Sequence, residues 1–208
     1  MRIGTGVGGV DVHCPIRLCA ASGSYYAEGV KIYTRGGDKG MTGLFFGGRV
    51  AKTSGPIEIN GAVDEAQAAL GWARSLSEPE SRVNDLLVSL ERDLWVLMAE
   101  VATLEANRRK LIDGSTRVTA AMITRLEELI DELSADIAMP DEFVVPGETQ
   151  LSAALDVART VIRRAERLAV AHPIDGSFVI AYLNRLSDLA WTMARWVEGP
   201  EHRTTRSR

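Results

Sequence analysis

Residues 159–167 read Arg159-Thr160-Val161-Ile162-Arg163-Arg164-Ala165-Glu166-Arg167 and stand in the middle of a long helical pattern. Apolar residues recur at helical spacing through this region, which predicts a helix over residues 149–171 with one apolar stripe. Arg159, Arg163 and Glu166 follow i, i+4, i+7 spacing and share a second stripe beside it. Guanidinium groups suit phosphate or carboxylate oxygens because they donate hydrogen bonds in a fixed plane. An ordinary solvated face is the simple alternative, since exposed ion pairs are common on helices.

Four more segments carry the same helical period of apolar residues. They cover residues 58–75, 83–106, 119–133 and 178–197. Asp64 and Glu65 fall early in the first of them, where carboxylates suit the helix dipole. His172 stands directly before Pro173, and we expect it to cap the preceding helix rather than to act as a catalyst.

Five helices with short connections and no strand-rich segment predict an all-α, up-and-down helical bundle. A chain of 208 residues is long enough for one domain with a sizeable core and short for two. We expect residues 1–30 to form a flexible arm, 31–197 the helical-bundle domain and 198–208 a frayed, charged tail. Phe143 begins a short apolar run between two helices, and such a run is more often core than ligand contact.

Composition and charge narrow the class of protein. The formal net charge of -4 argues against general nucleic-acid binding through bulk electrostatics. No apolar run approaches the roughly 20 residues that a membrane-spanning helix needs, and residues 1–30 make a poor secretory signal. Cys14 and Cys19 are the only cysteines, and without a nearby cluster of histidines they are not a zinc framework. Reduced thiols in a cytoplasmic protein are therefore expected.

The segment of residues 31–52 concentrates glycine and cationic side chains. It holds six glycines, two threonines and five basic residues. Glycines expose backbone N–H groups and permit positive φ angles, and this combination can cradle oxyanions such as a polyphosphate. It is not a Walker loop, because Lys39 is followed by Gly40 rather than by Ser or Thr. A glycine-rich surface hairpin without a ligand is the alternative.

The last predicted helix carries two polar side chains on one face. Asn184 and Asp188 stand one turn apart, and a buried Asn–Asp pair is costly without partners. Either this face is exposed, or the pair meets groups such as Arg159 and Arg163.

Three separated segments together carry a family resemblance. They are Tyr33-Thr34-Arg35-Gly36-Gly37-Asp38-Lys39-Gly40 with Gly47-Gly48-Arg49-Val50, then Ala158-Arg159-Thr160-Val161 with Arg163-Arg164-Ala165-Glu166-Arg167, and Tyr182-Leu183-Asn184-Arg185-Leu186-Ser187-Asp188. In this order they resemble the PduO-type ATP:cob(I)alamin adenosyltransferases. Shorter matches surround Asp64 and Phe143, and the likeness covers about residues 31–197.

The resemblance implies a fold and a reaction. It implies a five-helix bundle with a glycine-rich N-terminal nucleotide-binding loop, assembled as a homotrimer with active sites between subunits. It implies Mg2+ with ATP, and a reduced cobalamin as the second substrate, whose Co(I) attacks the 5′ carbon of ATP to give adenosylcobalamin and triphosphate. A corrinoid reductase and an adenosylcobalamin-dependent enzyme are the implied partners. Because Co(I) is already a strong nucleophile, such an enzyme needs positioning and charge stabilisation rather than a general base.

Roles for single residues follow from the resemblance by matching position. The loop residues expected to bind the triphosphate are Thr34, Arg35, Gly37, Asp38, Lys39, Gly40 and Lys52. Arg159 and Arg163 are expected to contact the nucleotide or its phosphates, with Glu166 helping to order them. Asp64 is expected to pair with Arg159 across a subunit interface, and Asn184 looks like the family's nucleotide-contacting asparagine.

The resemblance also implies two contacts to the corrinoid, and the sequence departs from the family pattern at three positions. Phe143 looks like the aromatic residue that keeps the corrinoid's lower base off cobalt, and Asp188 is expected to contact the corrinoid. Gly36 and Met41 stand where the family usually has Thr, and Glu148 where it usually has Gly. These departures motivate an alternative, a diverged non-catalytic sensor or carrier that binds ATP or cobalamin with the same fold. A third alternative is a helical scaffold that acts only through its interface. It would leave the basic, glycine-rich segment of residues 31–52 without a function.

Overall fold

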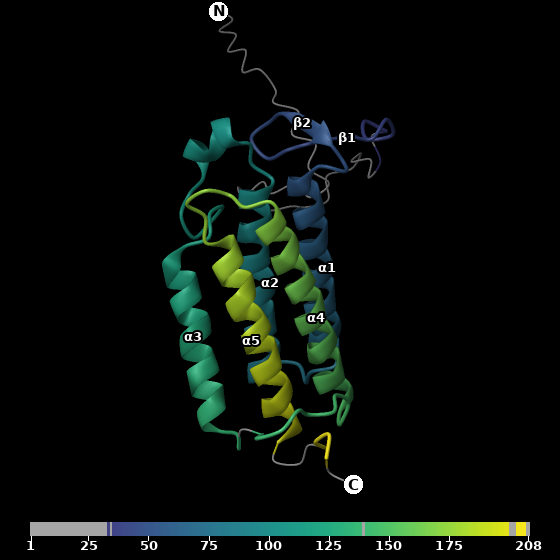
Figure 1. The fold of residues 1–208 in the computed structure, drawn as a ribbon, viewed down its shortest axis with the longest axis vertical. Coiled ribbons are helices and arrows are strands. Elements are labelled where there is room, and N and C mark those ends of the chain that lie inside the picture. The colour runs from purple at the N-terminus through teal and green to yellow at the C-terminus, as the bar shows by residue number, and fades with distance from the viewer. Residues whose placement is uncertain (1–32, 34, 139, 200–202, 207–208) are drawn as a thin grey trace, which may run out of the picture.

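The computed structural model describes residues 33, 35–138, 140–199 and 203–206, and in this part of the chain five α-helices run side by side along one axis (Figure 1). They are α1 (Gly55–Ser75), α2 (Arg82–Val101), α3 (Ala120–Ala135), α4 (Gln150–Ala171) and α5 (Val179–Glu198). Successive helices run in opposite directions. Helix α4 packs between α1 and α5, while α2 packs on α1 and α3 on α5. The predicted all-α, up-and-down bundle is confirmed, and the expected arm of residues 1–30 lies outside the described residues.

The core forms where each helix turns its apolar stripe inward. One fully buried residue from each helix illustrates this: Leu70, Leu94, Leu126, Ile162 and Leu186. Small residues such as Ala158 and Ala165 of α4 are also fully buried, which lets the neighbouring helices approach closely. None of the described helices is both long and apolar enough to cross a membrane.

Both ends of α4 are fixed by local hydrogen bonds. The Thr149 hydroxyl accepts from the backbone N–H of Ser152 over 3.0 Å, and the Ser152 hydroxyl accepts from the N–H of Thr149 over 3.1 Å. This reciprocal capping box satisfies backbone donors that a helix start leaves open. At the other end, the backbone N–H of His172 donates to the Leu168 carbonyl over 3.1 Å, so His172 caps the helix as predicted.

A small antiparallel hairpin sits at the end of the bundle where α1 begins (Figure 1). Its strands are β1 (Met41–Gly43) and β2 (Arg49–Ala51), with Thr42 opposite Val50. Gly47 and Gly48 in its turn have φ angles of +94° and +96°, which side chains with a Cβ adopt at a cost. The hairpin places the glycine-rich segment at one end of the molecule.

The predicted end of the second helix is wrong. Helix α2 stops at Val101 instead of continuing to residue 106, and residues Glu105–Lys110 form a short 3-10 helix, η1. The cause is a contact distant in sequence, because the Ala102 carbonyl accepts the backbone N–H of Phe45 over 2.8 Å. Thr103 also bridges to Phe45 as an isolated β-pair. Contacts with the hairpin at Ala102 and Thr103 therefore end α2.

The expected dipole role of Asp64 and Glu65 is also wrong. Helix α1 begins at Gly55, with Pro56 in its first turn, so both carboxylates lie in the third turn. Proline at a helix start has a φ angle already suited to the helix and lacks an N–H that would be unpaired there. The carboxylate in the first turn is Glu58.

Phe143 is not a core residue, because 85% of it is exposed. Its segment pairs instead with the described part of the C-terminal tail. The backbone N–H of Val145 donates to the Arg203 carbonyl over 2.8 Å, and the N–H of Thr205 donates to the Phe143 carbonyl over 2.9 Å. Residues 203–206 therefore pair with the chain around Phe143, and the expectation of a frayed tail stays a prediction.

Candidate functional site

One arginine holds the loop of the glycine-rich hairpin. Arg49 Nη2 donates to the Gly36 carbonyl over 2.7 Å and to the Met41 carbonyl over 3.2 Å. The backbone N–H of Lys52 donates to the Gly40 carbonyl over 2.8 Å. The hairpin that was the alternative interpretation is therefore the local structure, and its role toward phosphates stays a prediction.

The side chains expected at the phosphates point to solvent from this hairpin. Those described and exposed are Arg35, Asp38, Lys39 and Lys52. Gly37 approaches Lys52 closely, since a Cβ on Gly37 would lie 3.0 Å from Lys52 Nζ. Thr34 lies outside the described residues. Besides Arg49, the hairpin thus presents three exposed cations and one carboxylate from a short stretch of chain, which suits a polyanion.

The hairpin is docked on the segment that follows α2. Asn107 Nδ2 donates to the Phe46 carbonyl over 3.2 Å, and Lys110 Nζ lies 5.8 Å from the Phe46 ring centroid. Gly48 meets Leu104 so closely that a Cβ on Gly48 would lie 2.5 Å from Leu104 Cδ1. Sequence reasoning missed Asn107, because it stands 61 residues from Phe46 and no local pattern connects them.

A buried ion pair stabilises the segment after α2, on which the hairpin is docked. Glu100 is fully buried, its Oε1 accepts from Arg108 Nη2 over 2.8 Å, and its Oε2 accepts from the backbone N–H of Val118 over 2.7 Å. A carboxylate that is out of water needs such partners for both oxygens. The pair ties the segment after α2 to the chain that leads into α3.

The basic stripe of α4 divides into one held and one open arginine. Arg159 Nε donates to Asp156 Oδ1 over 3.1 Å within the helix. Arg163 is exposed, and among the described residues no side chain pairs with its guanidinium. Its carbonyl accepts from Arg167 Nη1 over 3.2 Å. The stripe therefore presents cationic groups to solvent on one side of the bundle.

Asp64 does not meet Arg159 within one chain. Its neighbour Glu65 forms an ion pair with Arg164 across the α1–α4 contact, whereas Asp64 is exposed and meets no cation in the described part of the chain. Arg159 is occupied by Asp156 on its own helix. Because the expected Asp64–Arg159 pair joins two subunits, it stays a prediction.

Asn184 connects α5 to α4 through Glu166. Its Nδ2 donates to Glu166 Oε1 over 2.9 Å, and its Oδ1 accepts from Arg185 Nη1 over 2.6 Å. Arg185 Nη1 also lies 3.5 Å from Asp188 Oδ2, and Asp188 is exposed. Within this chain, Asn184 and Asp188 therefore have partners other than Arg159 and Arg163. The second of the two expectations for this face, a contact with those two arginines, is not met within one chain.

A groove of about 430 Å³ lies between α3 and α5 beside these residues. Arg185 lies at its wall, where its Nε donates to Glu127 Oε1 over 2.9 Å. This hydrogen bond raises the pKa of the Arg185 guanidinium. Asp188 and Trp191 also line the groove, so the polar face of α5 borders a hollow with one aromatic wall.

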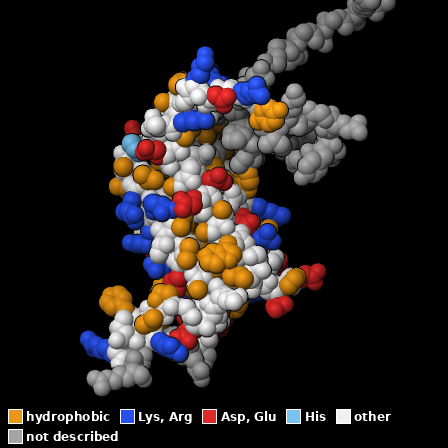
Figure 2. Space-filling model, turned by 90° about the vertical axis from the view of Figure 1, so that its right-hand side faces the viewer, with side chains coloured by type: hydrophobic (Ala, Val, Ile, Leu, Met, Phe, Trp, Pro, Cys, Tyr) orange, Lys and Arg blue, Asp and Glu red, His pale blue; other side chains and the backbone are white. Residues whose placement is uncertain are grey.

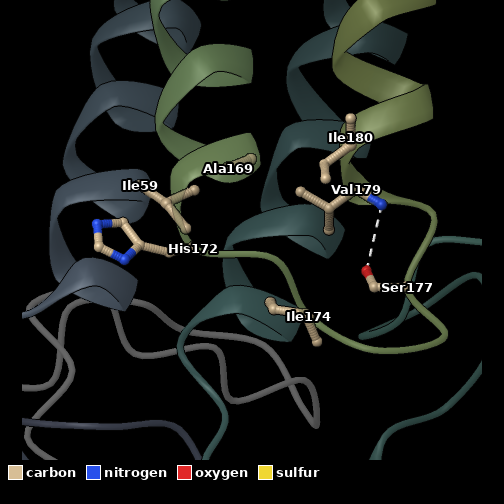
Figure 3. Close-up of a pocket in the computed structure, with 7 residues that line it drawn as sticks. All are labelled: Ile59, Ala169, His172, Ile174, Ser177, Val179 and Ile180. Carbon is tan, nitrogen blue, oxygen red and sulfur yellow. Dashed lines mark hydrogen bonds between the residues drawn. The ribbon is translucent and has the colours of Figure 1, made fainter.

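A second hollow, at the junction of α1, α4 and α5, is far smaller (Figure 3). Ile59, Ala169, His172 and Val179 are among its lining residues, and its volume is about 10 Å³. That volume is at most enough for a single water molecule. His172 also lies against Gly55, where a Cβ would be 2.5 Å from the ring. This hollow is a packing feature and is too small for a nucleotide.

The segment around Phe143 lies at the opposite end of the bundle from the hairpin (Figure 1). Its carboxylates pair with the tail, as Glu148 Oε1 lies 3.4 Å from Arg203 Nε and Glu142 Oε1 lies 3.5 Å from Arg206 Nη1. The Glu148 carboxylate, one of the departures from the family pattern, thus has a cationic partner in this chain. Within one chain, the segment around Phe143 is therefore separated from the hairpin by the length of the helical bundle (Figure 1).

The chain matches the family model described as "Cobalamin adenosyltransferase" over residues 32–197. It belongs to this family. Among curated relatives, the corrinoid adenosyltransferase of Mycobacterium tuberculosis is 42% identical to this chain over 170 residues, which are 79% of this chain and 87% of the relative. The protein from Mycobacterium leprae is 41% identical over 171 residues, covering 79% and 90%. The longer PduO of Salmonella typhimurium is 33% identical over 82% of this chain and 51% of its own length.

Solved structures extend the likeness to three dimensions. A variant of the PduO-type ATP:corrinoid adenosyltransferase from Lactobacillus reuteri, complexed with cobalamin and ATP, is 30% identical with a TM-score of 0.75. The match covers 86% of this chain and 98% of that one. Another variant of the same enzyme, complexed with ATP, gives a TM-score of 0.70 over 80% and 93% of the two chains. The resemblance inferred from three sequence segments is confirmed.

Proposed function

We propose that this chain transfers the 5′-deoxyadenosyl group of ATP to the Co(I) of a reduced corrinoid. The cobalt forms a bond to the 5′ carbon, the bond from that carbon to the triphosphate oxygen breaks, and inorganic triphosphate leaves. The observation that carries the proposal is membership of the cobalamin adenosyltransferase family together with the polar set that α4 and α5 present. That set consists of Arg159, Arg163, Glu166 and Asn184.

The chain's own groups suit the charge that develops during this reaction. The leaving triphosphate gains negative charge, and exposed cations aimed at it lower the barrier without a proton transfer. Arg163 and Lys39 are exposed and free to turn toward such an anion. Glu166 holds the Asn184 amide at 2.9 Å, which leaves the nucleotide a fixed polar surface on α5. Positioning two large substrates is the remaining task of the protein.

Mg2+ is proposed to enter with ATP. This ion binds proteins through one or two carboxylates plus the phosphates of the substrate and several waters. Asp38 is the one carboxylate of residues 35–52 and is exposed beside Lys39. The hairpin thus offers a donor of the kind that magnesium prefers, with cations on either side of it for the phosphates.

A homotrimer with sites between subunits is the proposed assembly. The hairpin and the segment between α3 and α4, which contains Phe143, lie at opposite ends of the bundle (Figure 1), and Asp64 and Arg159 do not pair within one chain. A neighbouring copy would supply the missing proximity in both cases. Exposed hydrophobic side chains lie among charged ones on the face seen in Figure 2, and α1 and α4 expose Trp72 and Val157. We place the protein in the cytoplasm, with a corrinoid reductase before it and an adenosylcobalamin-dependent enzyme after it.

The alternative is a non-catalytic protein that binds ATP or cobalamin. Gly36 and Met41 each remove a hydroxyl near the phosphates, which favours this alternative. Glu148 favours it less, because Arg203 neutralises its carboxylate. The arginine set of α4 is complete, and we therefore favour the enzyme.

One anaerobic experiment separates the two functions. The protein is mixed with Mg-ATP and chemically reduced cob(I)alamin, and the absorbance change to adenosylcobalamin is followed. Product formation at a useful rate is expected. No product, with ATP still raising the melting temperature, would favour the binding protein. The absence of product, together with no rise in melting temperature with either ATP or cobalamin, would contradict both functions.

A further inference from the structure

Asp156 is a buried carboxylate that holds two guanidinium groups at once. It lies in the second turn of α4 and is 5% exposed. Its Oδ1 accepts from Arg159 Nε over 3.1 Å, and its Oδ2 accepts from Arg195 Nη2 over 2.7 Å. Each carboxylate oxygen therefore has its own cationic donor, and the two donors come from different helices.

The second of these donors is itself fixed. Arg195 of α5 is 2% exposed, and its Nη2 also donates to Glu198 Oε1 over 3.0 Å. Its guanidinium stands 5.8 Å from the ring centroid of Trp191. Charges removed from water keep such partners because an unpaired one is costly. Arg195 thus has little freedom, and Asp156 is held between it and Arg159.

This arrangement fixes the inner edge of Arg159 and leaves its outer edge open. The Arg159 side chain is 28% exposed, and Asp156 engages its Nε. In the described part of the chain, no other side chain pairs with its terminal Nη groups. A guanidinium held at Nε presents the two terminal nitrogens in one plane, which is the geometry that phosphate and carboxylate oxygens match. A free arginine would lose side-chain entropy on meeting the same ligand.

We propose that Asp156 is a positioning residue that aims Arg159 at the nucleotide, with Arg195 as its anchor on α5. This inference rests on the proposed function and adds to it a residue that touches no substrate. The open edge of Arg159 then serves the phosphates and a carboxylate from a neighbouring subunit. Losing Asp156 frees Arg159 to adopt several side-chain conformations, few of which suit the ligand.

The test compares Asp156→Asn with Asp93→Asn. Both change a buried or partly buried carboxylate to an amide, but Asp93 lies on α2 with Tyr182 and Arg125 as its partners and touches neither Arg159 nor Arg195. We expect Asp156→Asn to lower kcat/KM for ATP by about 10- to 100-fold, since a small misplacement of a positioned group costs that much. Asp93→Asn is expected to keep kcat/KM within about twofold of the unchanged protein at a temperature where both are folded.

A double-mutant cycle separates positioning from general damage to the fold. If Asp156 acts through Arg159, then Asp156→Asn in an Arg159→Ala background changes kcat/KM by no more than about twofold. Independent losses that multiply would overturn the proposal, as would an Asp156→Asn protein with unchanged kcat/KM. Should Asp156→Asn fail to fold, Arg195→Lys takes its place in the same cycle. It keeps the positive charge but not the fork, and a loss coupled to Arg159 is again expected.

ATP affinity measured by calorimetry without corrinoid keeps this inference apart from the proposed function. A chain that binds ATP but forms no adenosylcobalamin would contradict the enzymatic function alone. The same double-mutant cycle, measured with the dissociation constant for ATP in place of kcat/KM, would then still report the coupling of Asp156 to Arg159. No coupling in that constant would overturn the positioning role, and no ATP binding at all would overturn both.

Discussion

Asn184 of α5 donates its side-chain amide to Glu166 of α4 over 2.9 Å. The bond joins two of the three sequence segments that carried the family resemblance, and it orients the Asn184 amide on the face of the bundle proposed to meet the nucleotide. Replacing Glu166 by Ala leaves that amide free to turn. We expect the dissociation constant for ATP to rise about tenfold, the size of one hydrogen bond to a charged group.

Calorimetry with ATP measures this effect. Glu128→Ala is the matched control, because Glu128 is an exposed carboxylate on α3. An equal change in both variants would assign the effect to net charge and contradict an ordering role for Glu166.

Arg163 is the open cation of the α4 stripe, and its removal should affect turnover more than stability. We expect Arg163→Ala to lower kcat by about 100-fold, which is typical when a donor to developing charge is lost. Arg167→Ala is the control, since it removes the same charge one turn along the same exposed face. The rate of adenosylcobalamin formation and the melting temperature are measured for both. Unchanged turnover of Arg163→Ala would refute its assignment.

The helices could be predicted because their apolar period is local. Helix α4 was expected over residues 149–171 and spans Gln150–Ala171, since Thr149 and Pro173 are signals readable from a few residues of sequence. The end of α2 could not be predicted in this way. It depends on a bond between Ala102 and Phe45, and no pattern within α2 reports the position of the hairpin.

The candidate site shows the same division. Arg159, Arg163 and Glu166 could be singled out from their spacing on one helix, and their roles toward the nucleotide stay predictions. Asp156 was missed although it stands three residues before Arg159, because its importance depends on Arg195, 39 residues away. Phe143 was expected in the core because it begins an apolar run, yet 85% of it is exposed. Pairing with the tail, and not hydrophobicity, decides its place.

Asp93 gives the fold a pH dependence whose sign is fixed by burial. Burial raises the pKa of the Asp93 carboxyl above its usual 3.8, although the Tyr182 hydroxyl, 3.0 Å away, and Arg125 oppose the shift. The folded protein therefore holds this proton to higher pH than the unfolded chain does. The stability that Asp93 contributes is fully present below the unfolded pKa and is lost as pH rises through the folded pKa.

Replacing Asp93 by Asn removes this dependence while keeping an acceptor for the Tyr182 hydroxyl. We expect the free energy of unfolding of the unchanged protein, minus that of Asp93→Asn, to fall as pH rises from about 4 to about 7. Urea unfolding at a series of pH values measures it, with Glu128→Gln as an exposed control. A difference that is constant with pH, or that grows, would show the wrong sign for Asp93.

Alanine substitutions at Gly47 and Gly48 distinguish the effect of backbone strain from the effect of losing the hairpin's docking contact. Their φ angles are +94° and +96°, so alanine at either position costs about 1–2 kcal/mol. A Cβ on Gly48 would also lie 2.5 Å from Leu104 Cδ1, while a Cβ on Gly47 would meet nothing within 4 Å. We therefore expect Gly48→Ala to loosen the hairpin from the segment after α2, and Gly47→Ala to leave it docked.

Hydrogen exchange of the Phe45 amide reports this docking, because that amide donates to the Ala102 carbonyl over 2.8 Å. It should exchange faster in Gly48→Ala than in Gly47→Ala, and ATP should bind more weakly in the first than in the second. Leu104→Ala added to Gly48→Ala removes the collision and should slow the exchange again. Equal exchange in the two glycine variants would mean that Leu104 yields to the new methyl group, and that Asn107, Lys110 and the Phe45 amide hold the hairpin in place without a close Gly48–Leu104 contact.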